Sequence, residues 1–66
     1  MEDYKVVETM RQYGGSFIRA FAELYRLADL QNQRILREAF PKYWMEYAEM
    51  TRQIERNREK GKDDLP

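Results

Sequence analysis

Apolar residues recur at helical spacing from the start of the chain, which predicts a short amphipathic helix over residues 3–13. Val6 and Met10 lie four residues apart and therefore fall on one face of that helix. The dipeptide Gly14-Gly15 is expected to end it, because glycine adopts positive φ angles without steric cost.

The most apolar stretch, residues 16–28, predicts a second helix that begins at Ser16 as its N-cap. Two adjacent apolar stripes run along it: Phe17, Phe21, Leu24 and Ala28, and then Ile18, Ala22 and Tyr25. Its polar strip is Arg19, Glu23 and Arg26, and Glu23 is expected to form a local ion pair with these arginines. A helix that is apolar over most of its circumference is buried on most sides. We therefore expect this helix at the centre of the fold, packed on at least two faces.

Two local signals divide the following residues. Asp29 is expected to cap a third, weaker helix over residues 30–40. The residue before a proline avoids the α region, so the pair Phe40-Pro41 marks a boundary, and Pro41 suits the first turn of the next helix.

A long last helix is predicted over residues 42–58. Four of its apolar residues are spaced four, three and four apart: Tyr43, Tyr47, Met50 and Ile54. Residues 55–60 contain no apolar side chain, and residues 61–66 are expected to be a flexible tail.

These elements predict an all-α fold, a small three- or four-helix bundle with a central buried helix at 16–28 and a long C-terminal helix at 42–58. Residues 1–60 form a single helical domain in this interpretation. No hairpin dipeptide or β-branched run indicates a strand.

The composition removes several classes of function. The chain contains no Cys and no His, which excludes disulfides, thiolate nucleophiles and the usual zinc ligands. With Ser16 explained as a helix cap, no catalytic, metal-binding or cofactor-binding residue is predicted, and we expect a protein that is not an enzyme. The formal charge is zero, twelve basic against twelve acidic residues, which does not favour a nucleic-acid or membrane-surface binder.

The size and the apolar content bear on location and assembly. No run approaches about eighteen apolar residues, and the N-terminus lacks the apolar core of a signal peptide, so a cytoplasmic protein is expected. A chain of 66 residues buries only about 60% of its unfolded surface, and without disulfides or a metal the bundle is expected to gain stability as a homodimer.

Two motifs allow a ligand-binding interpretation. Gly14-Gly15-Ser16 before a helix offers free N–H groups to an anion, but a phosphate loop needs more glycines, a lysine and a preceding strand. The helices joined at Asp29 also resemble a helix-turn-helix, with Gln33, Arg34 and Arg37 as the side chains that would read base edges. The turn lacks glycine and the chain lacks a basic face, so nucleic-acid binding is kept as the alternative.

The aromatic residues around Pro41 are either core or interface. Trp44 and Phe40 can pack under the central helix. Tyr and Trp are also enriched at binding hot spots, and the four-three spacing suits contact between helices. The candidate protein-interface residues are Tyr43, Trp44, Tyr47, Met50 and Ile54.

Three segments form a recognisable layout: Tyr13-Gly14-Gly15-Ser16-Phe17, Ala28-Asp29, and Phe40-Pro41-Lys42-Tyr43-Trp44. This layout resembles that of short uncharacterised phage and prophage proteins. The resemblance implies an accessory protein in the host cytoplasm and brings no site residue. The predicted function is therefore noncovalent protein binding, as an inhibitor of a host or defence complex. The alternatives are a nucleic-acid-binding protein and an oligomeric structural subunit.

Overall fold

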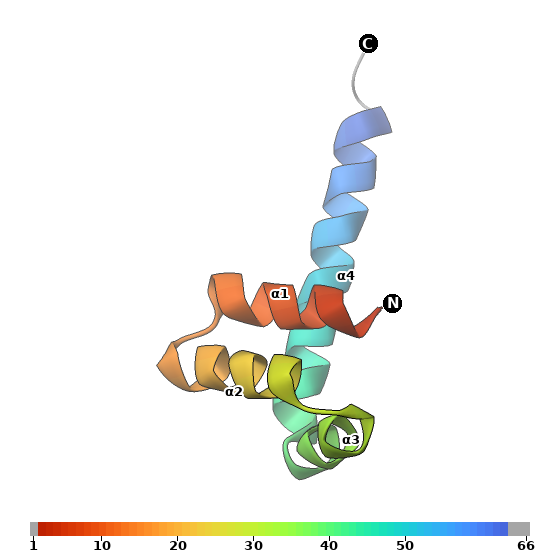
Figure 1. Ribbon diagram of the computed structural model, residues 1–66. Helices are drawn as coiled ribbons and strands as arrows, with labels where there is room; N and C mark the ends of the chain where they lie inside the picture. Colours follow the sequence, from red (N-terminus) through yellow and green to blue (C-terminus); the bar gives the residue numbers. More distant parts are fainter. Residues whose placement is uncertain (1, 64–66) are drawn as a thin grey trace.

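Four helices make up the fold. The computed structural model describes the backbone of residues 2–63 and the side chains of residues 2–58. Within that part of the chain lie α1 (Asp3–Tyr13), α2 (Ser16–Leu27), α3 (Leu30–Ala39) and α4 (Pro41–Asp63), and no strand. The helices α1 and α2 run antiparallel side by side and cross α4, while α3 lies at the end where α4 begins (Figure 1). The predicted all-α bundle is confirmed.

The signals at Asp29 and Pro41 act as predicted. The Asp29 side chain accepts a hydrogen bond from the backbone N–H of Asn32 at 2.8 Å, which caps α3. Pro41 is the first residue of α4. The last helix is longer than predicted, because its backbone stays helical to Asp63. Of the predicted tail, residues 64–66 lie outside the described residues, and the flexibility of 61–66 stays a prediction.

The prediction that Ser16 caps α2 is wrong. Gly15 occupies the N-cap position, and no side chain forms a capping hydrogen bond there. The reason is the first hydrogen bond of the helix, which the Arg19 N–H donates to the Gly15 carbonyl at 2.9 Å. This bond makes Ser16 the first helical residue.

Gly14 is required for a different reason from the one predicted. Its φ is −80°, and no described residue, glycine or other, has a positive φ. A Cβ at position 14 would instead collide with the Ile18 side chain, 2.6 Å from its Cβ, and with the Met10 carbonyl oxygen at 2.6 Å. The close approach of α1 and α2 at their turn therefore excludes a side chain.

The core lies mainly between α1 and α2. Its buried apolar residues are Val6, Val7, Met10, Ile18, Phe21, Ala22 and Tyr25. The other helices add half-buried residues against it: Leu36, Phe40, Trp44, Tyr47 and Ala48. The helix α2 is thus central, but the prediction that it is buried on most sides is wrong, since Phe17 and Leu24 are 53% and 54% exposed.

Polar contacts fasten α1 to α4. The Thr51 hydroxyl donates to Thr9 Oγ1 at 2.7 Å in the interior, and the Thr9 hydroxyl donates to the Lys5 carbonyl at 2.9 Å. Lys5 Nζ also forms an ion pair with Glu55 at 2.8 Å. The hydrogen bond between these two side chains, together with their opposite charges, raises the pKa of Lys5 and lowers that of Glu55.

Candidate protein-binding surface

An exposed apolar seam runs along α2. It consists of Phe17, Ala20, Leu24 and Leu27, spaced three, four and three residues apart, and all four are exposed. This is the spacing at which one helix presents its side chains to another helix. The buried residues of α2 lie on the adjacent flank, so the seam is additional to the core and not a part of it.

Part of the seam lines a groove between α2 and α3. The groove has a volume of about 410 Å³ and is lined by Leu24, Leu27, Ala28, Asn32, Ile35 and Leu36. Asn32 is the only polar side chain among them. Leu24, Leu27 and Ile35 are 54%, 68% and 52% exposed, so three of the large side chains of this apolar groove face solvent. Contiguous apolar surface of this kind marks interaction sites more often than single exposed leucines do.

At the Phe17 end of the seam, three aromatic rings pack together. Phe17 packs edge-on against Phe40 at 5.9 Å between ring centroids, and it packs at a tilt against Tyr43 at 5.5 Å. Phe40 in turn packs against the buried Phe21 at 5.7 Å. The aromatic corner of Phe17, Phe40 and Tyr43 is therefore anchored to the core, while Phe17 itself stays about half exposed. A surface with an aromatic corner anchored to the core at one end and an open aliphatic groove at the other suits the binding of a helix.

The predicted interface residues of α4 divide into two groups. The Trp44 ring packs at a tilt against Tyr25, 4.8 Å between ring centroids, and Tyr47 packs on the core, so both contribute to the fold. Tyr43 belongs to the aromatic corner and is 36% exposed. Met50 and Ile54 are half-buried. Of the five, Tyr43 is the one that joins the exposed apolar surface, and binding by the others stays a prediction.

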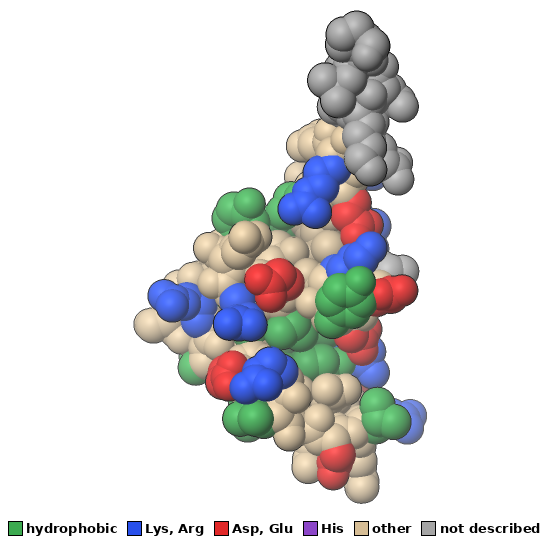
Figure 2. All heavy atoms as spheres, turned by 45° about the horizontal axis from the view of Figure 1, so that its top comes forward, with side chains coloured by type: hydrophobic (Ala, Val, Ile, Leu, Met, Phe, Trp, Pro, Cys, Tyr) green, Lys and Arg blue, Asp and Glu red, His purple; other side chains and the backbone are tan. Residues whose placement is uncertain are grey.

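The predicted nucleic-acid residues contact their own chain. Gln33 Nε2 donates to the Tyr25 carbonyl at 3.0 Å, and Arg34 forms an ion pair with Glu38 at 3.4 Å. Arg37 Nη1 lies 3.3 Å from Asp3 Oδ2, and its guanidinium lies 5.7 Å from the Trp44 ring centroid. Figure 2 shows acidic and basic side chains interspersed over the face it displays. Since Gln33 and Arg37 fasten α3 to its neighbours, no observation favours base readout by these side chains.

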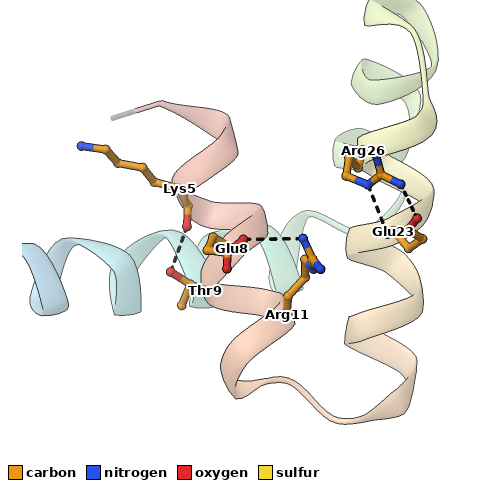
Figure 3. Close-up of polar contacts among 6 residues, drawn as sticks. All are labelled: Lys5, Glu8, Thr9, Arg11, Glu23 and Arg26. Carbon is orange, nitrogen blue, oxygen red and sulfur yellow. Dashed lines mark hydrogen bonds and ion pairs between the residues drawn. The ribbon is translucent and has the colours of Figure 1, made fainter.

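A charged cleft lies between α1 and α2, lined by Glu8, Arg11, Gln12, Ser16, Arg19, Ala20 and Glu23. The ion pairs Glu8–Arg11 (3.7 Å) and Glu23–Arg26 (2.6 Å) each lie within one helix (Figure 3). The hydrogen bonds from Arg26 lower the pKa of Glu23, so the ion pair predicted for Glu23 forms with Arg26. Two carboxylates share the cleft with the arginines, which makes the start of α2 a poor site for an anion.

Two observations concern metal ligands and proton affinity among the described residues. No three carboxylates among them gather where a metal ion could bind. Burial, together with the hydrogen bond to Asp3, raises the pKa of Tyr25 to about 12, so this hydroxyl stays protonated near neutral pH. No helix in the described part of the chain is long and apolar enough to cross a membrane.

Sequence reasoning did not single out Leu24, Leu27 and Ile35 as candidate site residues. A signal for the first two was present, since they continue the three-four-three spacing from Phe17 through Ala20 beside the buried stripe. Ile35 had no such signal. Comparison of the chain with protein-family models, curated proteins and solved structures gives no match.

Proposed function

We propose that this chain is a small, non-enzymatic protein-binding protein, and that its contact surface is the apolar groove with the adjoining aromatic corner. The observation that carries the proposal is the exposure of Phe17, Leu24, Leu27 and Ile35, each more than half exposed, on one side of α2 and α3. Covering such side chains is favourable by about 25 cal/mol for each Å² of apolar surface removed from water.

The remaining chemistry of the chain agrees with noncovalent binding. It offers no thiol or imidazole, and the Tyr25 hydroxyl holds its proton tightly because its pKa is raised to about 12. The resemblance to phage and prophage proteins supports an accessory role in the host cytoplasm. There the chain would inhibit a host or defence complex by covering a surface that the complex needs.

The test compares two charge insertions at exposed apolar positions. Leu24→Glu places a carboxylate in the apolar groove, and Met45→Glu places one on α4 outside it, where Met45 is 68% exposed. Tagged proteins are used to capture partners from a lysate of the cells that express the chain, followed by mass spectrometry. We expect the same partner with the parent protein and Met45→Glu, and its loss with Leu24→Glu. A partner retained equally by all three proteins would contradict the proposal.

A further inference from the structure

We propose that a second copy of this chain covers the exposed apolar seam of α2 in the isolated protein, with α2 packed antiparallel against α2 of the other copy. The inference rests on the contact surface named under the proposed function and assigns its partner. A two-fold axis makes an interface self-complementary, so one surface patch must fit itself. The seam of α2 meets that condition.

The register follows from the spacing. With the two-fold axis at the level of residue 22, Phe17 lies opposite Leu27 of the second copy. Ala20 then lies opposite Leu24 of the second copy, and the reverse pairs follow by symmetry. A large side chain faces a small one at the two inner positions. This is the complementarity that lets a leucine enter the space left by an alanine. Phe17 and Leu27 close both ends.

Charges beside the seam favour the antiparallel direction. Glu23 pairs with Arg26 in its own helix, whereas Arg19 has no ion pair among the side chains of residues 2–58. In the antiparallel register Arg19 of one copy lies within about one helical turn of Glu23 of the other. In a parallel pair the flank that carries Arg19 and Glu23 would lie opposite the other flank of the second copy, so these two charges would not approach each other.

The seam exposes apolar surface that a second copy would cover. Phe17, Leu24 and Leu27 are 53%, 54% and 68% exposed, and removing such apolar surface from water is favourable by about 25 cal/mol for each Å².

Sedimentation velocity over a range of concentrations tests the pairing. The parent protein and Met45→Glu are expected to sediment at twice the 8.1 kDa chain mass, and Leu24→Glu at the chain mass. Ala20→Arg is a second variant at an exposed position, expected to give monomers with an unchanged helical circular dichroism spectrum. A parent protein that stays monomeric, or a dimer that Leu24→Glu and Ala20→Arg leave intact, overturns the inference.

The two proposals fail in different ways. A monomeric parent protein that loses its captured partner through Leu24→Glu overturns the dimer and leaves the proposed function standing. A dimer that Leu24→Glu dissociates, with capture unaffected, supports the dimer and overturns partner binding at the groove. If Leu24→Glu changes neither property, both proposals are wrong.

A single spin label tests the direction of the pair. The chain has no cysteine, and a Cβ at Gly15 would meet no atom within 4 Å, so Gly15→Cys provides one accessible thiol without strain. In the antiparallel register the two labelled backbone positions lie about 23 Å apart, and in a parallel pair about 10 Å apart. A pulsed electron paramagnetic resonance distance near the shorter value overturns the antiparallel register.

Discussion

The hydroxyl of Tyr25 donates a hydrogen bond to Asp3 Oδ2 at 2.9 Å, across 22 residues of sequence, and so joins α2 to the first turn of α1. The same oxygen accepts from Arg37 Nη1 at 3.3 Å, which adds α3. Arg37 also lies over the Trp44 ring on α4, so the Asp3 carboxylate joins three helices directly and is linked to the fourth through Arg37.

This contact predicts an order of stability for two variants. Asp3→Ala leaves the Tyr25 hydroxyl, in a side chain 2% exposed, without its partner, which costs about 1–3 kcal/mol. Tyr25→Phe removes the donor but leaves Asp3 with Arg37 and solvent, so we expect a smaller loss of about 1 kcal/mol. Urea denaturation followed by circular dichroism measures both losses. Equal losses, or a larger loss for Tyr25→Phe, would contradict the argument.

The pKa of Tyr25 predicts the alkaline behaviour of the fold. It is raised from 10.0 to about 12 by burial and by Asp3, so the folded state holds this proton more tightly than the unfolded chain. The contribution to stability is therefore complete below pH 10 and is lost as the pH rises from 10 through 12, by about 2–3 kcal/mol in total. We expect the free energy of unfolding to fall over that range, and to fall less in Tyr25→Phe.

The two glycines of the first turn predict unequal effects of alanine. Gly14→Ala drives a methyl group into Ile18 and the Met10 carbonyl, and we expect a loss of about 1–3 kcal/mol. Gly15→Ala meets open space at φ −76°, and the gain from restricting the unfolded chain offsets the cost of alanine at the N-cap, so we expect a change of less than about 1 kcal/mol. Thermal unfolding of both variants checks the pair, and similar melting temperatures would count against the steric account.

The buried threonines predict a case of non-additivity. Thr51 lies 2.7 Å from both Thr9 Oγ1 and the Tyr47 carbonyl, and its one proton serves a single acceptor at a time. Thr9→Val or Thr51→Val alone is expected to cost about 1 kcal/mol. Replacing both with valine removes donor and acceptor together and is expected to cost less than the sum of the two. A double-mutant cycle by urea denaturation measures this difference. Strict additivity would show that the hydrogen bond between Thr51 and Thr9 contributes nothing to the free energy of unfolding.

Helix boundaries were predictable wherever one residue sets the local backbone. Asp29 and Pro41 act on the turn that contains them, so their effect is readable from the chain alone. Gly14 also marked a boundary, but the reason for it depends on Ile18, whose position follows from how α2 folds back on α1. The sequence shows that a turn occurs there and not how closely the two helices approach.

The candidate site was less predictable, because burial depends on which neighbours cover each flank of a helix. Phe17, Phe21 and Leu24 fall in one helical stripe, yet Phe21 is buried and the other two are exposed. The partners of Arg37 lie 34 residues away at Asp3 and across a helix junction at Trp44. The residues next to Arg37 in the sequence do not show whether its side chain contacts other helices of the fold or faces nucleic acid.

The hydrogen bond between Thr9 and Thr51 has a consequence for synthesis, since its two residues are 42 positions apart. At about 5–20 residues per second, α1 waits on the order of 2–8 s for the segment of α4 that holds it. During that interval the surface of α1 that α4 later covers has no partner, and it can be covered only after the chain has grown past Thr51.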